Sequence, residues 1–287
     1  MTDPASGQGV PTAELRLEVG SSTHTGLRRR ANEDSYLAVS PVFLVADGMG
    51  GHEAGEVASA LAVDAFAALT GPAFLAPTDI RTAFRSAHAA IASLASSGKR
   101  RAGTTVSGVA VAENDGSAYW LVFNLGDSRT YRLAAGELEQ ISVDHSVVQE
   151  LLDVGELDRA SAATHPGRNV ITRALGAGGE FEPDYWLVPV EAGDRMLVCS
   201  DGVSGELDDE LIGRILQSEQ SAQDAATRLV HEGILRGGRD NLTAVVIDAW
   251  DRETADRRQS NRHDDHQTEG RSEDTIPRGP VEVGGRN

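Results

Sequence analysis

Acidic residues stand next to apolar, strand-like runs at five separate places in this chain. They are Glu33 and Asp34 before "SYLAVS", Asp47 after "FLVA", Asp127 after "LVFNLG", Asp201 after "MLVCS" and Asp240 before "NLTAVVID". Strand ends are rigid, and hard divalent cations prefer carboxylate and carbonyl oxygens as ligands. We therefore expect these acids to converge from separate strands on a Mg²⁺ or Mn²⁺ site.

Glycines cluster directly after the first of these strand ends. In "FLVADGMGGHEAGE", Asp47 is followed by Gly48, Gly50 and Gly51. Glycine lets the backbone come close to a ligand, so the Gly48 carbonyl is itself a candidate metal ligand. Two divalent ions about 3.5–4 Å apart can share a bridging water and lower its pKa, and the resulting hydroxide attacks an electrophile in line.

Three arginines precede the first acidic pair, in "LRRRANED". Arg28, Arg29 and Arg30 therefore lie close in sequence to Glu33. A guanidinium group holds a phosphate through two parallel hydrogen bonds. An arginine tied to a metal-binding acid points to hydrolysis of a phosphate ester, and a solvated basic surface is the alternative.

The charge and composition exclude several other classes. The net charge of −18 disfavours nucleic acid and anionic membranes as partners. Lys99, the only lysine, is followed by Arg100, which excludes a P-loop and the kinase lysine signature. Cys199 is the only cysteine, and Gly205 stands where a cysteine phosphatase needs arginine. No apolar run is long enough to span a bilayer and the first residues do not read as a secretory signal, so we expect a cytoplasmic protein.

The order of the elements predicts an α+β fold. Many short runs rich in Val, Leu, Ile and aromatic residues alternate with turn residues, and Asp115-Gly116 predicts a hairpin turn. Helical periodicity occurs in pairs, at residues 53–70 and 79–97 and again at 208–217 and 221–235. We expect residues 14–249 to fold as one domain, with a disordered N-terminus at 1–13 and a disordered polar tail at 250–287.

Seven segments taken together resemble a known family. They are "RRANEDS", "VADGMGGHEAGEVAS", "GTTVSGVAV", "NLGDSRTYRL", "HPGRNVITRALG", "LVCSDGV" and "GGRDNLTAVVI". Their order is similar to that in the metal-dependent serine/threonine protein phosphatases of the PP2C or PPM family, in its bacterial form. The resemblance covers residues 19–248. It implies a four-layer αββα sandwich, in which two central antiparallel β-sheets are flanked by helix pairs, and a flap subdomain covers the active site at about 144–177.

The resemblance also implies a role for individual residues. The ligands of two central Mn²⁺ or Mg²⁺ ions are matched by Asp47, the Gly48 carbonyl, Asp201 and Asp240. Glu33 matches a ligand of the second ion, Asp34 matches an acid that acts through metal-bound water, and Asp127 matches a ligand of a third, weaker ion. Arg29 matches the phosphate-binding arginine. Met49 stands where many eukaryotic members carry a histidine. The general acid therefore stays open between His52 and metal-bound water.

The implied activity is hydrolysis of phosphoserine and phosphothreonine by a metal-bridging hydroxide, without a phosphoenzyme. The expected partners are phosphorylated proteins and an opposing serine/threonine kinase, and a monomer is expected. In the flap, His145, His165 and Arg173 are candidates for substrate contact, with a structural role as the alternative. Two other readings are a phosphopeptide-binding pseudoenzyme, which would need lost metal ligands, and a stress-signalling phosphatase acting on one small regulatory protein.

Overall fold

The computed structural model describes residues 10–50, 54–96, 102–162, 165–178, 181–252 and 254. Met1–Asp251 forms one compact unit, and Arg252–Asn287 is separated from it. His52 and nearly all of the expected C-terminal tail therefore lie outside the described residues. None of the helices in the described part of the chain has the length and hydrophobicity needed to cross a bilayer.

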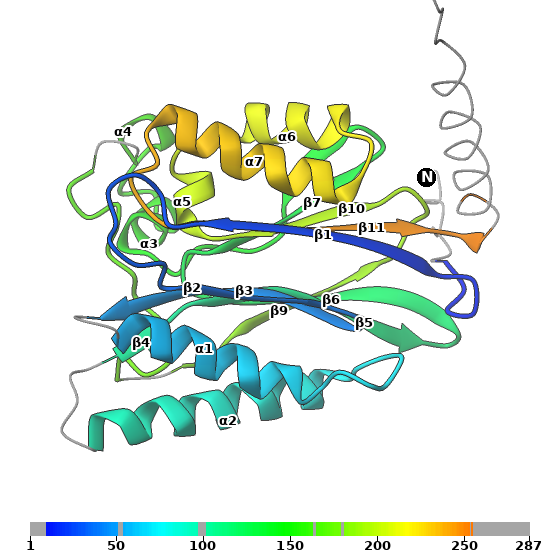
Figure 1. Cartoon of the computed structure of the whole chain (residues 1–287), viewed down its shortest axis with the longest axis horizontal. Coiled ribbons are helices and arrows are strands. Elements are labelled where there is room, and N and C mark those ends of the chain that lie inside the picture. Colours follow the sequence, from blue (N-terminus) through cyan, green and yellow to red (C-terminus); the bar gives the residue numbers. More distant parts are fainter. Residues whose placement is uncertain are drawn as a thin grey trace, which may run out of the picture. The chain divides into compact units, whose positions relative to one another are not determined.

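The compact unit has four layers, two β-sheets face to face and helices on both outer faces (Figure 1). One sheet contains β2 (Asp34–Val39), β3 (Val42–Gly50), β4 (Ala102–Thr104), β5 (Val106–Asn114), β6 (Ser117–Leu125) and β9 (Asp184–Pro189). The other contains β1 (Arg16–His24), β7 (Arg129–Ala134), β8 (Glu137–Gln140), β10 (Arg195–Cys199) and β11 (Leu242–Trp250). Their orders are β2-β3-β5-β6-β9, with β4 on β3, and β1-β11-β10-β7-β8.

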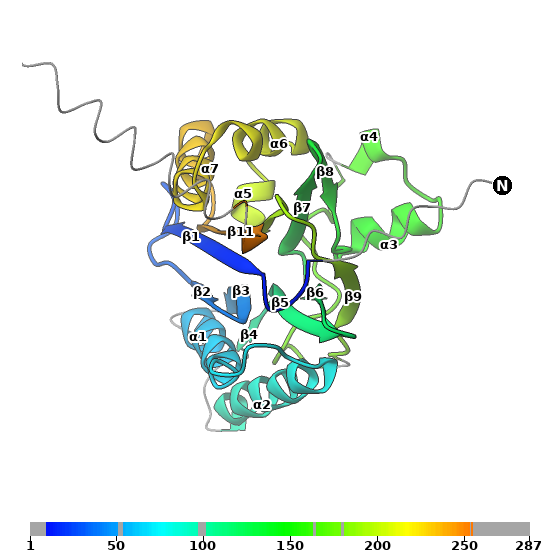
Figure 2. The ribbon, with the colours of Figure 1, turned by 90° about the vertical axis from the view of Figure 1, so that its right-hand side faces the viewer.

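The helices fall into two pairs and three shorter elements. They are α1 (Ala54–Ala67), α2 (Pro77–Ser96), α3 (Val147–Asp153), α4 (Arg159–Ala162), α5 (Asp201–Ser204), α6 (Asp209–Ser218) and α7 (Ala222–Arg236). Figure 2 shows α1 and α2 under one sheet, α6 and α7 over the other, and α3 and α4 beside the sandwich. All strand pairs are antiparallel. The expected αββα sandwich is confirmed.

Apolar side chains fill each of the three spaces between the layers. Phe43, Trp120 and Val245 belong to the cluster between the sheets. Phe66 of α1 stacks on Phe123 of β6, with ring centroids 5.3 Å apart. Because strand residues alternate between faces, each sheet supplies one set of side chains to the shared core and another to its helices. The sheets are therefore fixed relative to each other, which positions their ends.

The hairpin prediction is confirmed, whereas the edge strands β1 and β8, the three-residue strand β4 and one boundary were not foreseen. Asp115 and Gly116 both have positive φ, as a two-residue turn between β5 and β6 requires. The edge strands β1 and β8 carry too few apolar residues for alternation to predict them. The segment expected to be disordered at 1–13 is described from Val10, which is 6% exposed and whose N–H donates to Val190 O at 2.8 Å. A single apolar residue that covers the edge of the core gives no periodic signal.

A buried ion pair joins the β10–β11 pair to the end of α6. Arg195 donates two hydrogen bonds to Asp248, at 2.6 and 2.7 Å, and another to Leu216 O. Asp248 is fully buried. Removing one partner of such a pair leaves a buried charge without compensation, which is strongly destabilising.

We expect Arg195→Met to lower the free energy of unfolding by about 3–5 kcal/mol, measured by urea denaturation. Arg214→Met is the matched control, because Arg214 makes an exposed pair with Glu210 one helical turn away. Its loss should be about 0.2–1 kcal/mol. Similar losses in the two variants would contradict a special role for the buried pair.

Candidate metal centre

Six acidic side chains from both sheets meet at one end of the sandwich. Asp34 and Asp47 are directly opposite each other in the β2–β3 register. Asp201 is the first residue of α5, immediately after β10 and Ser200, and Asp240 lies two residues before β11. The charges of Asp201, Asp34 and Asp127 all act on Asp47, and that of Asp240 acts on Glu33. The structure thus brings together all the acids singled out in the sequence.

Asp34 is held by hydroxyl groups of the opposite sheet. Its Oδ2 accepts hydrogen bonds from Thr243 Oγ1 at 2.6 Å and from Ser200 Oγ at 2.8 Å. Its Oδ1 is buried and accepts no hydrogen bond from the described residues. Burial raises the pKa of Asp34 to about 7, against the lowering effect of the two hydroxyls, and the charges of Asp201 and Asp240 add to the rise.

Asp47 and Asp201 lie close enough to influence each other's pKa. Burial and then the charge of Asp201 raise the pKa of Asp47 well above its usual value. Burial and then the charge of Asp240 raise the pKa of Asp201.

Asp127 follows a tightly held turn after β6. His145 clamps Gly126 from two sides: its N–H donates to Gly126 O at 2.8 Å, and its Nδ1 accepts from Gly126 N at 3.2 Å. Burial and then the charge of Asp201 raise the pKa of Asp127 to about 8. His145 is 3% exposed and its Nε2 lies 3.1 Å from Asp184 Oδ2. Of the two roles open for His145, the structure shows the structural one.

Gly48 has no room for a side chain. A Cβ atom there would lie 2.2 Å from Gly55 O and 2.6 Å from Glu33 O. Its N–H donates to Glu33 O at 3.1 Å, which links the end of β3 to the segment before β2. Any other residue at this position would push Glu33 and the start of α1 away from Asp47, so the glycine is required by close packing.

Arg29 reaches the centre from the loop between β1 and β2. Its Nη2 lies 2.5 Å from Asp240 Oδ2. Glu33 lies close to both: burial raises the pKa of Glu33, the charge of Arg29 lowers it, and the charge of Asp240 raises it again. His165 and Arg173 lie in the segment expected to form the flap. The His165 ring accepts from Gly167 N, and Arg173 pairs with Asp184.

Asn241 is a positioning residue that the sequence reasoning missed. Its Nδ2 donates to Thr25 O at 2.8 Å and to Ala31 O at 2.9 Å, and its Oδ1 accepts from Glu33 N at 2.9 Å. The side chain is 4% exposed and thus closes both ends of the loop that carries Arg29. The only signal in the sequence was the position of Asn241 directly after the candidate ligand Asp240. An asparagine at a turn before a strand explains that position equally well.

The donor set fits hard divalent cations. Asp34 Oδ1, Asp127 Oδ1 and Asp201 Oδ1 are buried carboxylate oxygens that accept no hydrogen bond from the described part of the chain. No three His, Cys, Asp or Glu side chains within that part are already arranged around one point. The charge of Asp201 acts on Asp47, and Asp240 pairs with Arg29. Divalent cations would supply the positive charge that these carboxylates need.

The fold and this acid cluster agree with the comparisons to known proteins. The chain belongs to the protein phosphatase 2C family, whose family model matches residues 29–243. It is 41% identical over 243 residues to the serine/threonine protein phosphatase PstP of Mycobacterium tuberculosis, which covers 83% of this chain. It is 35% identical to the serine/threonine phosphatase stp of Listeria welshimeri, over 79% of this chain and 93% of that protein.

A solved structure matches with the same fold. The catalytic domain of PstP in complex with two manganese ions is 38% identical, with a TM-score of 0.75, over 83% of this chain and 100% of that one. The family resemblance read from the seven segments is confirmed. The chain spans 46% of the length of the mycobacterial PstP protein that it matches.

The raised pKa values predict an unusual pH dependence of stability. Asp34 and Asp127 have pKa values of about 7 and about 8 in the folded protein, against an ordinary value of 3.8. Each stabilises the folded state while it is protonated, and this stability is lost as the pH rises through the folded value. With a chelator present, we expect the melting temperature to fall from about pH 5.5 to pH 8, because the free energy of unfolding declines by up to about 1.4 kcal/mol per pH unit for each group until the pH reaches its folded pKa.

Saturating Mn²⁺ should remove this decline, because the ions bind the deprotonated carboxylates. Asp127→Asn should reduce the decline above pH 7 in the chelated protein, since one titrating group is gone. Scanning fluorimetry across the pH series measures both effects. A chelated protein that becomes more stable toward pH 8.5 would contradict the raised pKa values.

Asn241→Ala should reduce kcat/KM for p-nitrophenyl phosphate by about 10- to 100-fold, because a loosely held Arg29 loop misplaces the phosphate. Most of the change should appear in KM. Gln223→Ala is the matched control: this amide also bridges backbone, donating to Ser21 O at 3.0 Å, but away from the loop. Equal losses of activity in both variants would indicate a general effect on the fold.

Proposed function

We propose that the chain is a metal-dependent protein serine/threonine phosphatase. The observation that carries this proposal is the convergence of Asp34, Asp47, Asp127 and Asp201 in a buried cluster, with Arg29 and Asp240 beside it. Buried carboxylates with raised pKa values in one place mark a functional site. The arginine adds a phosphate ligand, which selects phosphate esters among the substrates of such a centre.

The chain would hold two central Mn²⁺ or Mg²⁺ ions and a third, weaker one. Asp47, the Gly48 carbonyl, Asp201 and Asp240 are the proposed central ligands, with Glu33 on the second ion and Asp34 acting through water. Asp127, with Asp201, is proposed for the third ion. When bound, the ions supply the positive charge that ionises an attacking water. The two manganese ions in the PstP catalytic domain support the central pair.

Each side chain around the centre has a separate task. Arg29 would bind two phosphoryl oxygens and turn the phosphorus toward the centre. Its partner Asp240 is 32% exposed and would bind a cation in place of the guanidinium. Thr243 and Ser200 keep Asp34 in one orientation through its Oδ2. The proton for the leaving alcohol is proposed to come from water or from His52, which lies outside the described residues.

The proposed substrates are proteins phosphorylated on serine or threonine, opposing a serine/threonine kinase. Relatives with phosphatase names in Mycobacterium tuberculosis and Listeria support this class. The flap, at about 144–177, would influence which phosphoproteins fit, because α3 and α4 stand beside the sandwich (Figure 2). A monomer in the cytoplasm remains our expectation. A phosphopeptide-binding pseudoenzyme is disfavoured because all the candidate ligands are present.

Asp201→Asn and Asp240→Asn should each reduce turnover of p-nitrophenyl phosphate and of a phosphothreonine peptide by about 10²-fold or more, since each removes a negative ligand of the centre. Excess EDTA should have the same effect on the unchanged protein, and Mn²⁺ should restore activity. Asp127→Ala serves as the graded comparison. It should lower activity while the protein still binds two Mn²⁺ ions in an equilibrium binding measurement.

Turnover that persists in EDTA would exclude the metal-dependent mechanism. Phosphopeptide binding without turnover in saturating Mn²⁺ would favour the pseudoenzyme. Circular dichroism should show that both Asp→Asn variants fold, because each substitution keeps the side chain's size and removes a charge from a repulsive cluster.

A further inference from the structure

Of the three consecutive arginines beside the candidate centre, the proposed chemistry uses only Arg29. Arg29 pairs with Asp240. Its neighbours Arg28 and Arg30 are exposed, and neither has an ion pair with any of the described residues. Exposed arginines without partners are common on a protein surface, so their surroundings decide whether they form a binding surface.

The arginine loop runs along the segment that follows α7. Leu27 N donates to Gly238 O at 2.7 Å. A Cβ atom on Gly26 would lie 2.1 Å from Asp240 O, and one on Gly238 would lie 3.1 Å from Leu27 Cγ. The two segments therefore form one continuous surface, and Arg29 and Asp240 are the part of it that reaches the centre.

A second arginine reinforces the positive charge of this surface. Arg239 donates from Nε and Nη2 to the Glu206 carboxylate, both at 2.9 Å. The hydrogen bond from Arg239 is the main cause of the lowered pKa of Glu206, and the charge of Arg28 contributes further. The Glu206 carboxylate, whose side chain is 4% exposed, thus pairs with Arg239 and also feels the charge of Arg28. One acid cannot neutralise two arginines.

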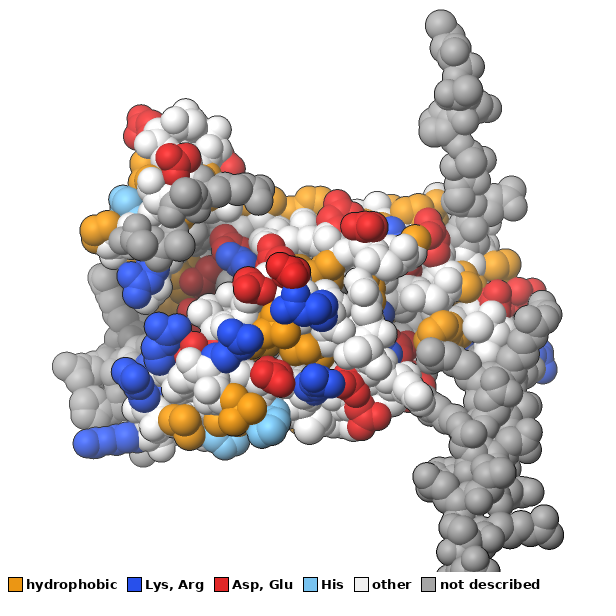
Figure 3. Space-filling model, turned by 90° about the horizontal axis from the view of Figure 1, so that it is seen from above, with side chains coloured by type: hydrophobic (Ala, Val, Ile, Leu, Met, Phe, Trp, Pro, Cys, Tyr) orange, Lys and Arg blue, Asp and Glu red, His pale blue; other side chains and the backbone are white. Residues whose placement is uncertain are grey.

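Large apolar side chains lie on the same two segments. Leu27 is 65% exposed and Leu235, in the last turn of α7, is 67% exposed. Figure 3 looks down on the layer of α6 and α7 and shows basic and hydrophobic side chains next to one another there. We call Leu27, Arg28, Arg30, Leu235, Arg236 and Arg239 the arginine–leucine surface.

The local charge is opposite to that of the whole protein. Residues 26–30 and 236–240 contain five arginines and one acidic residue, in a chain of net charge −18. A positive patch with exposed apolar side chains suits a partner segment that is acidic and partly apolar. Because Arg29 belongs to the same loop, a segment bound there would lie next to the phosphate at the centre.

We propose that the arginine–leucine surface binds acidic residues that flank the phosphorylated residue of the substrate protein. This inference rests on the proposed phosphatase function and specifies its substrate class. The enzyme therefore prefers phosphorylation sites in acidic surroundings over neutral ones, and the preference comes from charges outside the metal centre.

The test compares two phosphothreonine peptides of equal length, one with glutamates around the phosphothreonine and one with glutamines. The unchanged protein with Mn²⁺ should show a kcat/KM about 3- to 10-fold higher for the acidic peptide. The preference should shrink in about 0.5 M salt, because exposed charges are screened. The double variant Arg28→Gln with Arg30→Gln should bring the ratio of the two kcat/KM values close to one.

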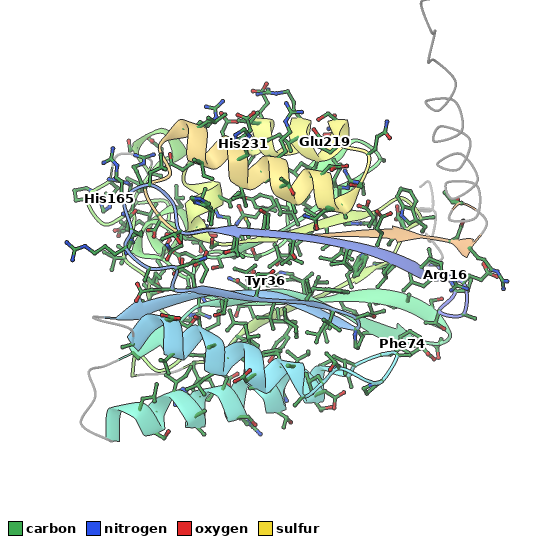
Figure 4. All side chains as sticks on the ribbon, in the orientation of Figure 1. Arg16, Tyr36, Phe74, His165, Glu219 and His231 are labelled. Carbon is green, nitrogen blue, oxygen red and sulfur yellow. The ribbon has the colours of Figure 1, made fainter. Side chains whose placement is uncertain are left out.

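The matched control is Arg16→Gln with Arg85→Gln, which removes the same charge from exposed positions elsewhere. Figure 4 places Arg16 at the opposite end of the sandwich from His165 of the flap. This control should keep the full preference. Arg236→Gln provides a second test outside the Arg29 loop, and it should reduce the preference by a smaller factor.

Three outcomes would overturn the inference. The first is equal hydrolysis of both peptides by the unchanged protein. The second is a preference for the acidic peptide that does not shrink in the Arg28/Arg30 variant. Equal loss of preference in the Arg16/Arg85 control would show that only net charge matters. If the unchanged protein hydrolyses neither peptide nor p-nitrophenyl phosphate in Mn²⁺, the proposed function itself fails, and the substrate preference with it.

Discussion

The mutual repulsion of buried carboxylates is the constraint on which this end of the molecule depends. Asp34, Asp47, Asp127 and Asp201 all have pKa values raised first by burial, and each feels the charge of at least one other acid. A fold selected for stability alone would not place these groups together. Their coexistence is understandable when cations occupy the space between them, since the same charges that repel one another then become ligands.

The sandwich keeps these acids close because they are attached to strands of both sheets. The core between the sheets fixes the ends of β2, β3, β10 and β11 relative to one another. Short polar side chains complete the arrangement: Thr243 and Ser200 hold Asp34, and Asn241 holds the loop of Arg29. The repulsive cluster is thus embedded in a rigid frame, which limits how far the acids can move apart when no cation is bound.

Two segments of the chain border the acid cluster. On one side, the turn before Asp127 is connected through His145 to Asp184 at the start of β9. On the other side, the loop that carries Arg29 exposes Leu27, Arg28 and Arg30. Under the proposed function, these two segments would contact the protein substrate.

The sequence by itself determined the fold class, the hairpin at Asp115-Gly116 and the set of acids, because apolar periodicity, turn chemistry and residue type are local properties. It could not predict the edge strands β1 and β8 or the burial of Val10, since these depend on what packs against them. Only the tertiary structure decided that Asn241 closes the Arg29 loop and that Gly48 has no room for a side chain. Both follow from contacts between segments far apart in the chain, and such contacts leave no mark on local sequence patterns.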